Sequence, residues 1–268
     1  MADVALLHVD ERVAVLTLNR PEARNALNTE LVRTLRALVA EVERRDDVDV
    51  LVLTGADPAF CAGLDLKELG RDGGVLKRGA LDDDPAPGAA DGRGRGRWTT
   101  LPTTKPIIGA VNGVAVTGGL ELALNCDFLV ASERARFADT HARVGVHPLW
   151  GLTVLLPQAV GMRRAREMSA TGNFVDAEQA LAWGLVNHVV PHDELLPRAR
   201  RLAADIVSSD QRAVRAILGT YEEASRVPGG EAWELELRRA AQFQSGGVDP
   251  AEIERRRRAV VDRGRSQV

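Results

Sequence analysis

Two short apolar runs rich in Val and Leu lie near the N-terminus, Val4–Val9 and Val13–Leu18. Three charged residues at positions 10–12 separate them, so the pattern predicts a β-hairpin. Asn28 then precedes apolar residues at helical spacing, and Asn is favoured at the position before a helix. The apolar stripe of this expected amphipathic helix comprises Leu31, Val32, Leu35, Leu38, Val39 and Val42.

Continuous apolar runs further along the chain are typical of buried strands. They comprise Val48–Leu53, Ile107–Val111 and Phe128–Ala131. A helix start is expected at Leu120–Asn125, and after Pro157 the pattern becomes helical. Asp176 with Gln179 has the pattern of a capping box, and Gly184 fits the end of that helix. Later helices are expected to start at Asp193, Asp210 and Asp249, with another around Glu231–Phe243.

The segment Gly70–Arg97 differs from the rest because Gly, Asp, Pro and Arg replace the apolar residues. It has almost nothing to bury, so we expect a mobile surface loop over about residues 70–98. The order of strands and helices therefore predicts an α/β core over residues 1–195, which contains this loop. A C-terminal helical region is expected over residues 196–268.

Composition narrows the class of protein. With 268 residues, 45% of them apolar, the chain can form one large domain with an appendage. The net charge of −3 gives no bulk attraction to nucleic acid. Cys61 and Cys126 supply neither a disulfide framework nor a metal cluster, and no signal peptide is visible. Polar and acidic residues interrupt the best membrane candidate, residues 107–131, so we expect a cytoplasmic protein that binds no metal and no membrane.

The segment Lys105–Asp127 carries the most informative chemistry. Gly118 and Gly119 lie where a strand is expected to turn into a helix, and glycine lets a ligand approach the main chain. The free N–H groups of a first helical turn, with the helix dipole, favour a developing oxyanion. Glu121 follows in that turn among apolar neighbours. It could simply complement the helix dipole, but an expected buried carboxylate favours a functional role.

A second glycine turn, Ala59–Lys67, also follows an expected strand. Gly63 could expose the backbone N–H of Leu64, although an ordinary strand-to-helix turn is an equally good interpretation of this segment alone. Two such turns after two core strands could direct two amides at one carbonyl oxygen.

Together these motifs resemble those of the enoyl-CoA hydratase/isomerase (crotonase) superfamily. The similar segments are Asn19–Leu27, Ala59–Lys67, Lys105–Asp127 and Ala177–Val186, in the right order and spacing. The resemblance implies an α/β fold built as a crotonase-like spiral of ββα units, with a C-terminal helical trimerisation region. It also implies an acyl-CoA substrate, no cofactor apart from the coenzyme A thioester, and a homo-trimer or a hexamer made of two trimers.

The resemblance further implies roles for individual residues. The N–H groups of Leu64 and Gly118 would form the oxyanion hole for the thioester oxygen. Glu121 would match the first catalytic glutamate of the hydratases, which activates water for addition to the β-carbon. Coenzyme A and substrate would be held by residues of the two turns and the helix start: Arg24, Ala26, Ala62, Gly63, Asp65, Leu66, Lys67 and Gly119.

The chain departs from the family pattern at the second catalytic glutamate, which is replaced by His141. An imidazole with an ordinary pKa of about 6.5, raised by a neighbouring carboxylate, could exchange the proton instead. Alternatively, His141 merely packs in a repurposed pocket. The weaker polar candidates nearby are Asp139, Arg143 and His147. Leu149 and Trp150 are bulky where the family keeps small residues, which points to an altered acyl pocket.

The predicted activity is hydratase-like: water adds across the 2,3 double bond of an acyl-CoA thioester through an oxyanion-stabilised enolate. Replacement of the second glutamate disfavours a plain double-bond isomerase. It leaves open another crotonase-type reaction, namely that of an acyl-CoA hydrolase, dehydratase or decarboxylase. A distant alternative is an RNA-binding crotonase scaffold, supported only by Arg33, Arg36 and Arg44, so nucleic acid is not an expected partner.

Overall fold

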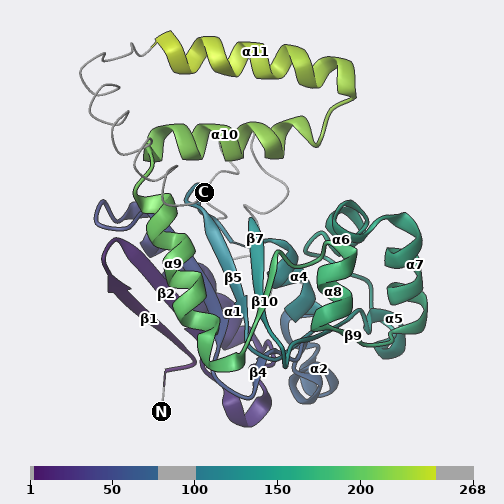
Figure 1. Ribbon diagram of the computed structural model, residues 1–268. Coiled ribbons are helices and arrows are strands. Elements are labelled where there is room, and N and C mark those ends of the chain that lie inside the picture. Colours follow the sequence, from purple (N-terminus) through teal and green to yellow (C-terminus); the bar gives the residue numbers. More distant parts are fainter. Residues whose placement is uncertain (1–2, 78–100, 246–268) are drawn as a thin grey trace. The chain divides into compact units, whose positions relative to one another are not determined.

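The computed structural model describes residues 3–77 and 101–245. The chain falls into two units, residues 1–211 and residues 212–268. Among the described residues, the first unit holds two β-sheets and the helices that surround them, and the second holds a pair of helices (Figure 1). No helix in the described ranges has the length and apolar character needed to cross a membrane.

The larger sheet has six strands in the order β1-β2-β3-β5-β7-β10. These are β1 (Ala5–Asp10), β2 (Val13–Leu18), β3 (Val50–Gly55), β5 (Ile107–Val111), β7 (Phe128–Ser132) and β10 (His188–Val190). β1 and β2 pair antiparallel, which confirms the predicted hairpin, and all the other neighbours pair parallel.

The smaller sheet has four strands in the order β4-β6-β8-β9. These are β4 (Ala59–Cys61), β6 (Val114–Val116), β8 (Arg136–Ala138) and β9 (Val175–Asp176). Each of β3, β5 and β7 in the larger sheet is followed by a strand of the smaller sheet and then by a helix. This repeated strand–strand–helix path is the expected spiral of ββα units, and it brings the ends of β4, β6 and β8 to one edge.

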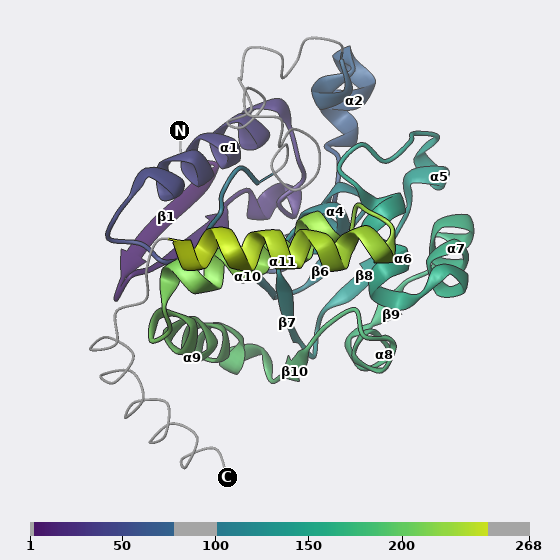
Figure 2. The same ribbon diagram turned by 90° about the horizontal axis from the view of Figure 1, so that it is seen from above.

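Eight α-helices are described in the first unit. They are α1 (Thr29–Arg44), α2 (Leu66–Asp72), α4 (Gly118–Leu124), α5 (His141–Val144), α6 (Leu152–Val160), α7 (Met162–Thr171), α8 (Ala177–Trp183) and α9 (Leu195–Val207). Short 3-10 helices are described at Pro21–Ala23, Gly74–Leu76 and His192–Glu194. In both views, α5 to α8 gather at the side of this unit that is remote from β1 (Figures 1 and 2).

Both faces of the larger sheet are covered, which explains why every residue of β3 is buried. Val50 and Val52 face α9 and pack with its Leu195 and Ala199. Residues 51 and 53 belong to the core on the opposite face, with α1 and the smaller sheet. Helix α9 therefore packs on the sheet of the first unit.

Local capping follows the sequence closely. The side chain of Asn28 accepts a hydrogen bond from the N–H of Leu31 at 2.9 Å, and Asp176 does the same for Gln179 at 2.8 Å. Gly184 ends α8 in the left-handed conformation that glycine favours. These contacts confirm the predicted helix starts at Asn28 and Asp176.

Three element boundaries differ from the predictions. Helix α4 begins at Gly118 rather than Leu120, and α6 begins at residue 152, so that Pro157 lies within it. α9 starts at Leu195, after a 3-10 turn that includes Asp193. In the segment expected to be a loop, residues 70–77 contain the end of α2 and a 3-10 helix that buries Val75. The rest of that expected loop, residues 78–98, lies outside the described residues.

The described part of the second unit comprises two antiparallel helices, α10 (Gln211–Ala224) and α11 (Gly229–Ser245). An ion pair between Glu223 and Arg239 joins them, and the Arg212 guanidinium lies 4.1 Å from the centre of the Phe243 ring. These elements confirm the helices predicted after Asp210 and around residues 231–243. The expected start at Asp249 lies outside the described residues.

Candidate active site

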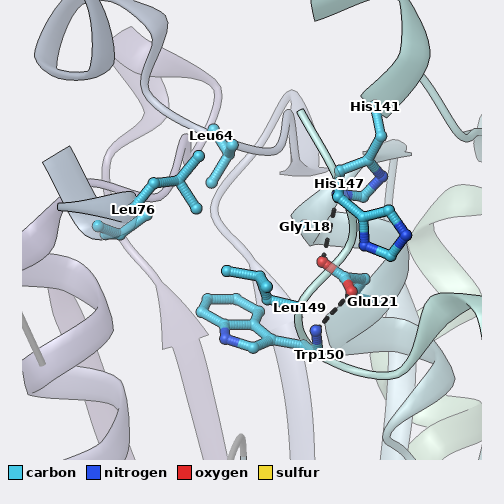
Figure 3. Close-up of a pocket in the computed structure, with 9 residues that line it drawn as sticks. Leu64, Leu76, Gly118, Glu121, His141, His147, Leu149 and Trp150 are labelled. Atoms are coloured by element: carbon cyan, nitrogen blue, oxygen red, sulfur yellow. Dashed lines mark hydrogen bonds and ion pairs between the residues drawn. The ribbon is translucent and has the colours of Figure 1, made fainter. Parts of the chain in front are cut away.

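One pocket brings together the residues predicted as catalytic groups, oxyanion hole and acyl pocket (Figure 3). Its lining comprises Leu64, Val75, Leu76, Gly118, Glu121, His141, His147, Leu149 and Trp150. Val75 and Leu76 come from the segment expected to be a loop, and no local pattern indicates that they line a pocket. They belong to the 3-10 helix after α2, which contacts α1 and α2 and buries Val75.

Two backbone amides meet at this pocket because β4 and β6 pair side by side and each is followed by a turn. The N–H of Leu27 donates to the carbonyl of Gly63 at 2.7 Å, and the N–H of Asp65 donates to the carbonyl of Leu27 at 3.0 Å. These two hydrogen bonds form a parallel β-bridge between Leu27 and Leu64. They use the carbonyl of Gly63 and the N–H of Asp65, so neither of them involves the N–H of Leu64. Within the described residues, neither the N–H of Leu64 nor that of Gly118 has a hydrogen-bond acceptor. Both donors are therefore available to a ligand oxygen.

Glycine is required at two positions in these turns. Gly63 has φ of +89°, and a Cβ there would lie 2.7 Å from the carbonyl oxygen of Val116. At Gly119, a Cβ would lie 2.2 Å from the carbonyl oxygen of Cys61. Gly119 is absent from the pocket lining, so close packing against β4 accounts for this glycine.

Three titratable side chains form a buried chain beside the amides. Glu121 lies in the first turn of α4 and is 3% exposed, and His141 opens α5 and is 4% exposed. The Nε2 atom of His141 lies 3.4 Å from Oε2 of Glu121 (Figure 3). The Nδ1 atom lies 2.7 Å from Oδ1 of Asp139, which also accepts the backbone N–H of His141 at 3.1 Å. The imidazole is therefore held between two carboxylates.

This arrangement decides the charge of the imidazole. Burial by itself lowers the pKa of His141, but its hydrogen bonds with Asp139 and Glu121 and their negative charges outweigh burial and raise the pKa to about 9. Burial of Asp139 opposes its ionisation, yet hydrogen bonds with His141 and Ser169 hold the pKa of that carboxyl below its usual range. At neutral pH, His141 is an imidazolium that directs one N–H toward Glu121 and the other toward Asp139.

The main chain of Trp150 is anchored on α4. Its N–H donates to Oε1 of Glu121 at 2.7 Å, and its carbonyl accepts from the side chain of Asn125 at 2.8 Å. The indole lies over the start of α4, since a Cβ on Gly118 would be 3.9 Å from the ring. Trp150 and the exposed Leu149 thus line the same pocket as Gly118.

The remaining residues with predicted substrate contacts surround the turn that carries Leu64 and do not line the pocket. Arg24 has a left-handed backbone, and its carbonyl accepts the N–H of Ala62 at 3.0 Å, which joins the two turns. Asp65 caps α2 and forms an ion pair with Arg20 at 3.0 Å. Ala26 is buried beside this turn, whereas Leu66 and Lys67 are exposed at its surface.

The weaker polar candidates of the sequence analysis differ in whether they lie at the pocket. Arg143 bonds the carbonyl of Thr171 and is not part of the pocket lining, whereas His147 lines the pocket. Asp139 is the functional candidate that sequence reasoning underrated. The available signal was its position two residues before His141, where an Asp side chain can bond both the following backbone and the imidazole.

The site defines a class of enzyme. Two unpaired amides beside a buried carboxylate and an imidazolium can stabilise charge on a carbonyl oxygen while protons move next to it. Within the described ranges, no cluster of three or more His, Cys, Asp or Glu side chains is arranged to hold a metal ion. The amides, the carboxylate and the imidazolium support enolate or tetrahedral oxyanion formation assisted by acid–base catalysis.

Comparison with known proteins identifies the family. Residues 8–248 match the family described as Enoyl-CoA hydratase/isomerase. A probable peroxisomal enoyl-CoA hydratase 1 from Arabidopsis thaliana is 38% identical over 87% of this chain and 84% of its own length. A crotonyl-CoA hydratase from Syntrophomonas wolfei is 34% identical over 86% of each chain. The chain therefore belongs to the enoyl-CoA hydratase/isomerase family, which confirms the predicted superfamily and the hydratase-like class of enzyme.

Solved structures agree with this assignment. The enoyl-CoA hydratase from Mycobacterium tuberculosis H37Rv is 51% identical, with a TM-score of 0.72 over 91% of this chain and 99% of that one. An enoyl-CoA hydratase from Bacillus anthracis is 29% identical, with a TM-score of 0.81 over 94% of this chain and 95% of that one. The predicted crotonase fold is thereby confirmed.

Proposed function

We propose that this chain adds water to the 2,3 double bond of a trans-2-enoyl-CoA thioester. The observation that carries the proposal is the Glu121–His141 pair, which shares one pocket with two unpaired amides. Relatives named enoyl-CoA hydratase and crotonyl-CoA hydratase match most of the chain and support the same reaction.

Binding of the thioester oxygen is the first step. The N–H groups of Leu64 and Gly118 would hold this oxygen, which becomes negative as the reaction proceeds. Donors that are fixed before the reaction act most strongly on charge that develops in the transition state. Coenzyme A would run along the turns at residues 24–26 and 62–67, which the backbone bond between Arg24 and Ala62 joins.

Water addition then needs a base and an acid. Glu121 accepts a proton from water while the water oxygen forms a bond to the β-carbon, and the electron pair of the double bond moves to give the enolate. The Nε2–H of His141 then donates its proton to the α-carbon, and the enolate collapses to the thioester carbonyl. One water has been added, and a neutral Glu121 faces a neutral His141.

The contact between these two side chains restores the starting state. A proton passes from the carboxyl of Glu121 to Nε2 of His141, across the 3.4 Å that separates them. Because Asp139 favours the imidazolium, the transfer regenerates both the carboxylate and the charged imidazole. His141 therefore takes the proton-donating position that the resemblance assigns to a second glutamate.

The test is turnover of crotonyl-CoA by the purified chain, with the product identified by mass. Gain of one water is expected, and Glu121→Gln should lower kcat by about 10²-fold or more, the range for loss of a general base. Glu178→Gln is the matched control, because Glu178 occupies the first turn of α8 but is exposed and lies outside the pocket lining. Release of free coenzyme A or of carbon dioxide instead of hydration would contradict the proposal and favour the hydrolase or decarboxylase alternative.

We also propose that the chain assembles into a trimer or a hexamer made of two trimers. Each helix of the second unit exposes two large apolar side chains four residues apart, Ile217 and Tyr221 on α10 and Trp233 and Leu237 on α11. Exposed apolar stripes of this kind are typical of interfaces. Light scattering should give three or six times the chain mass of 28.9 kDa, and Leu237→Glu should reduce it. A monomeric wild-type chain would contradict this proposal.

The cytoplasmic location stays a prediction, since relatives include proteins named as peroxisomal and mitochondrial.

A further inference from the structure

Thr117, the residue before Gly118, has an unusual backbone conformation. Its φ is +54° and its ψ is −116°, a region that glycine adopts freely and other residues rarely do. Among the described non-glycine residues with positive φ, Thr117 alone is β-branched. It is 3% exposed, so the conformation is imposed by its surroundings rather than by an open surface turn. Such residues persist only where neighbouring contacts hold them, and they concentrate at functional sites.

Three contacts hold Thr117 in this conformation. Its N–H donates to the carbonyl of Ala138 at 3.0 Å, and its carbonyl accepts the N–H of Glu121 at 3.0 Å. Its hydroxyl lies 2.5 Å from the hydroxyl of Thr140. Thr140 directly precedes His141, and its own φ of −102° is unstrained. Thr117 therefore connects the start of the Glu121 helix with the segment that carries the imidazole.

The ψ angle of Thr117 sets the direction of an oxyanion donor. Rotation about ψ of one residue turns the peptide plane that contains the N–H of the next residue. The ψ angle of Thr117 thus determines the direction in which the N–H of Gly118 points. If Thr117 relaxed toward an ordinary β-region conformation, this peptide would rotate and the N–H would no longer be aimed as it is now.

We propose that Thr117 is a positioning residue for the oxyanion hole. Its hydroxyl bond to Thr140 holds the 117–118 peptide so that the Gly118 N–H faces the thioester oxygen. The same bond fixes that donor relative to His141, so that charge stabilisation and proton donation keep one geometry. This inference rests on the proposed function, because it assigns a role within the same site.

The experiment removes the hydroxyl bond from either side. Thr117→Val and Thr140→Val each replace a hydroxyl by a methyl group of similar size, and the double variant removes both. Thr54→Val is the matched control: Thr54 is 3% exposed and donates a buried hydroxyl bond to Ala110 at 2.8 Å, but it lies outside the pocket lining. Thr117→Ser keeps the hydroxyl and tests rescue.

We expect each single variant to lower kcat by about 10-fold to 10²-fold, with KM changed less than about threefold. Complete loss of one oxyanion donor lowers kcat by about 10²-fold to 10³-fold, and a misdirected donor retains part of its effect. The double variant should be no worse than the poorer single variant, because both remove one interaction. Thr117→Ser should recover most of the lost kcat, and Thr54→Val should leave kcat unchanged.

Infrared difference spectroscopy of a bound saturated acyl-CoA supplies a readout that a merely structural role would not move. Hydrogen bonds to the thioester carbonyl lower its stretching frequency, so the frequency should shift toward that of free acyl-CoA in Thr117→Val and Thr140→Val. An unchanged frequency, or a fall in melting temperature with unchanged kcat, would overturn the inference. A wild-type chain that lowers the carbonyl frequency but hydrates no enoyl-CoA would contradict the proposed reaction and still allow the positioning role to be measured. If Thr117→Val does not fold, Thr140→Val alone decides, because its backbone is unstrained.

Discussion

Replacement of Asp139 by Asn tests how the charge of His141 is controlled. The change keeps the size of the side chain and an oxygen that can accept the Nδ1–H, but it removes the negative charge 2.7 Å from the imidazole. The mechanism requires a protonated His141 as acid. Because the pKa of His141 is raised, activity should persist from neutral pH upward and fall as the pH passes through about 9.

The structure sets the size of the effect. The rise of the His141 pKa from 6.5 to about 9 corresponds to about 3 kcal/mol in favour of the imidazolium. Burial opposes this rise, so the two carboxylates together supply more than the net value. Asp139 makes the shorter contact, and its hydrogen bond is the largest of the contributions that raise the pKa of His141. An adjacent opposite charge typically moves a pKa by about 1 to 3 units, so Asp139→Asn should move the alkaline limb down by about 1 to 2 units.

The assay is the pH dependence of kcat/KM for crotonyl-CoA, which reports the apparent pKa values of the coupled side chains in the free enzyme. The wild-type chain should lose activity near pH 9, and Asp139→Asn should lose it near pH 7 to 8. Asp176→Asn is the matched control, since Asp176 also accepts a backbone N–H but is exposed and caps the remote α8. An alkaline limb that stays near pH 9 in Asp139→Asn would refute the reasoning, even if kcat fell at every pH.

Three further predictions concern the pocket, the core and the Asp139–His141 pair. Trp150→Ala should raise kcat/KM for a longer enoyl chain relative to crotonyl-CoA by about 10-fold, and an unchanged ratio would remove the indole from the acyl pocket. Lys105→Met should lower the free energy of unfolding in urea by about 1 to 3 kcal/mol, because the buried ammonium donates to the Val42 carbonyl at 2.6 Å; no change would contradict this. His141→Glu alone should be less active than the double variant Asp139→Asn/His141→Glu, because the single variant places a third negative charge next to the carboxylates of Asp139 and Glu121. Equal kcat/KM values for the two variants would argue against this.

Much of the site could be predicted because its parts are local in sequence. Asn28 caps its helix through a bond to a residue three positions away, and Gly118 and Glu121 share one helical turn. Gly63 indicates a turn, because its positive φ and the close approach of Val116 leave no room for a side chain. Such features depend on the backbone geometry of a few neighbouring residues, so the local amino-acid pattern is enough to predict them.

The features that were missed depend on contacts between distant segments. Leu76 lines the pocket from a stretch expected to be a loop, because a 3-10 helix packs this stretch against α1 and α2. Nothing in the pattern of α9 itself indicates that its Leu195 packs with the strand valines of the core. Trp150 is held by the side chains of Glu121 in α4 and of Asn125 just after it, 29 and 25 positions away. Local periodicity carries no information about such partners.

The segment from Asp139 to His141 explains how an imidazole can stand where the family pattern has a glutamate. Burial lowers the pKa of this imidazole, and the hydrogen bonds and charges of Asp139 and Glu121 together reverse that tendency. Thr140, between Asp139 and His141, bonds the hydroxyl of the strained Thr117. Asp139, Thr140 and His141 therefore contact, in order, the imidazole, the residue before Gly118 and the carboxylate of Glu121. If the proposed mechanism holds, the role of His141 depends on both of the residues before it.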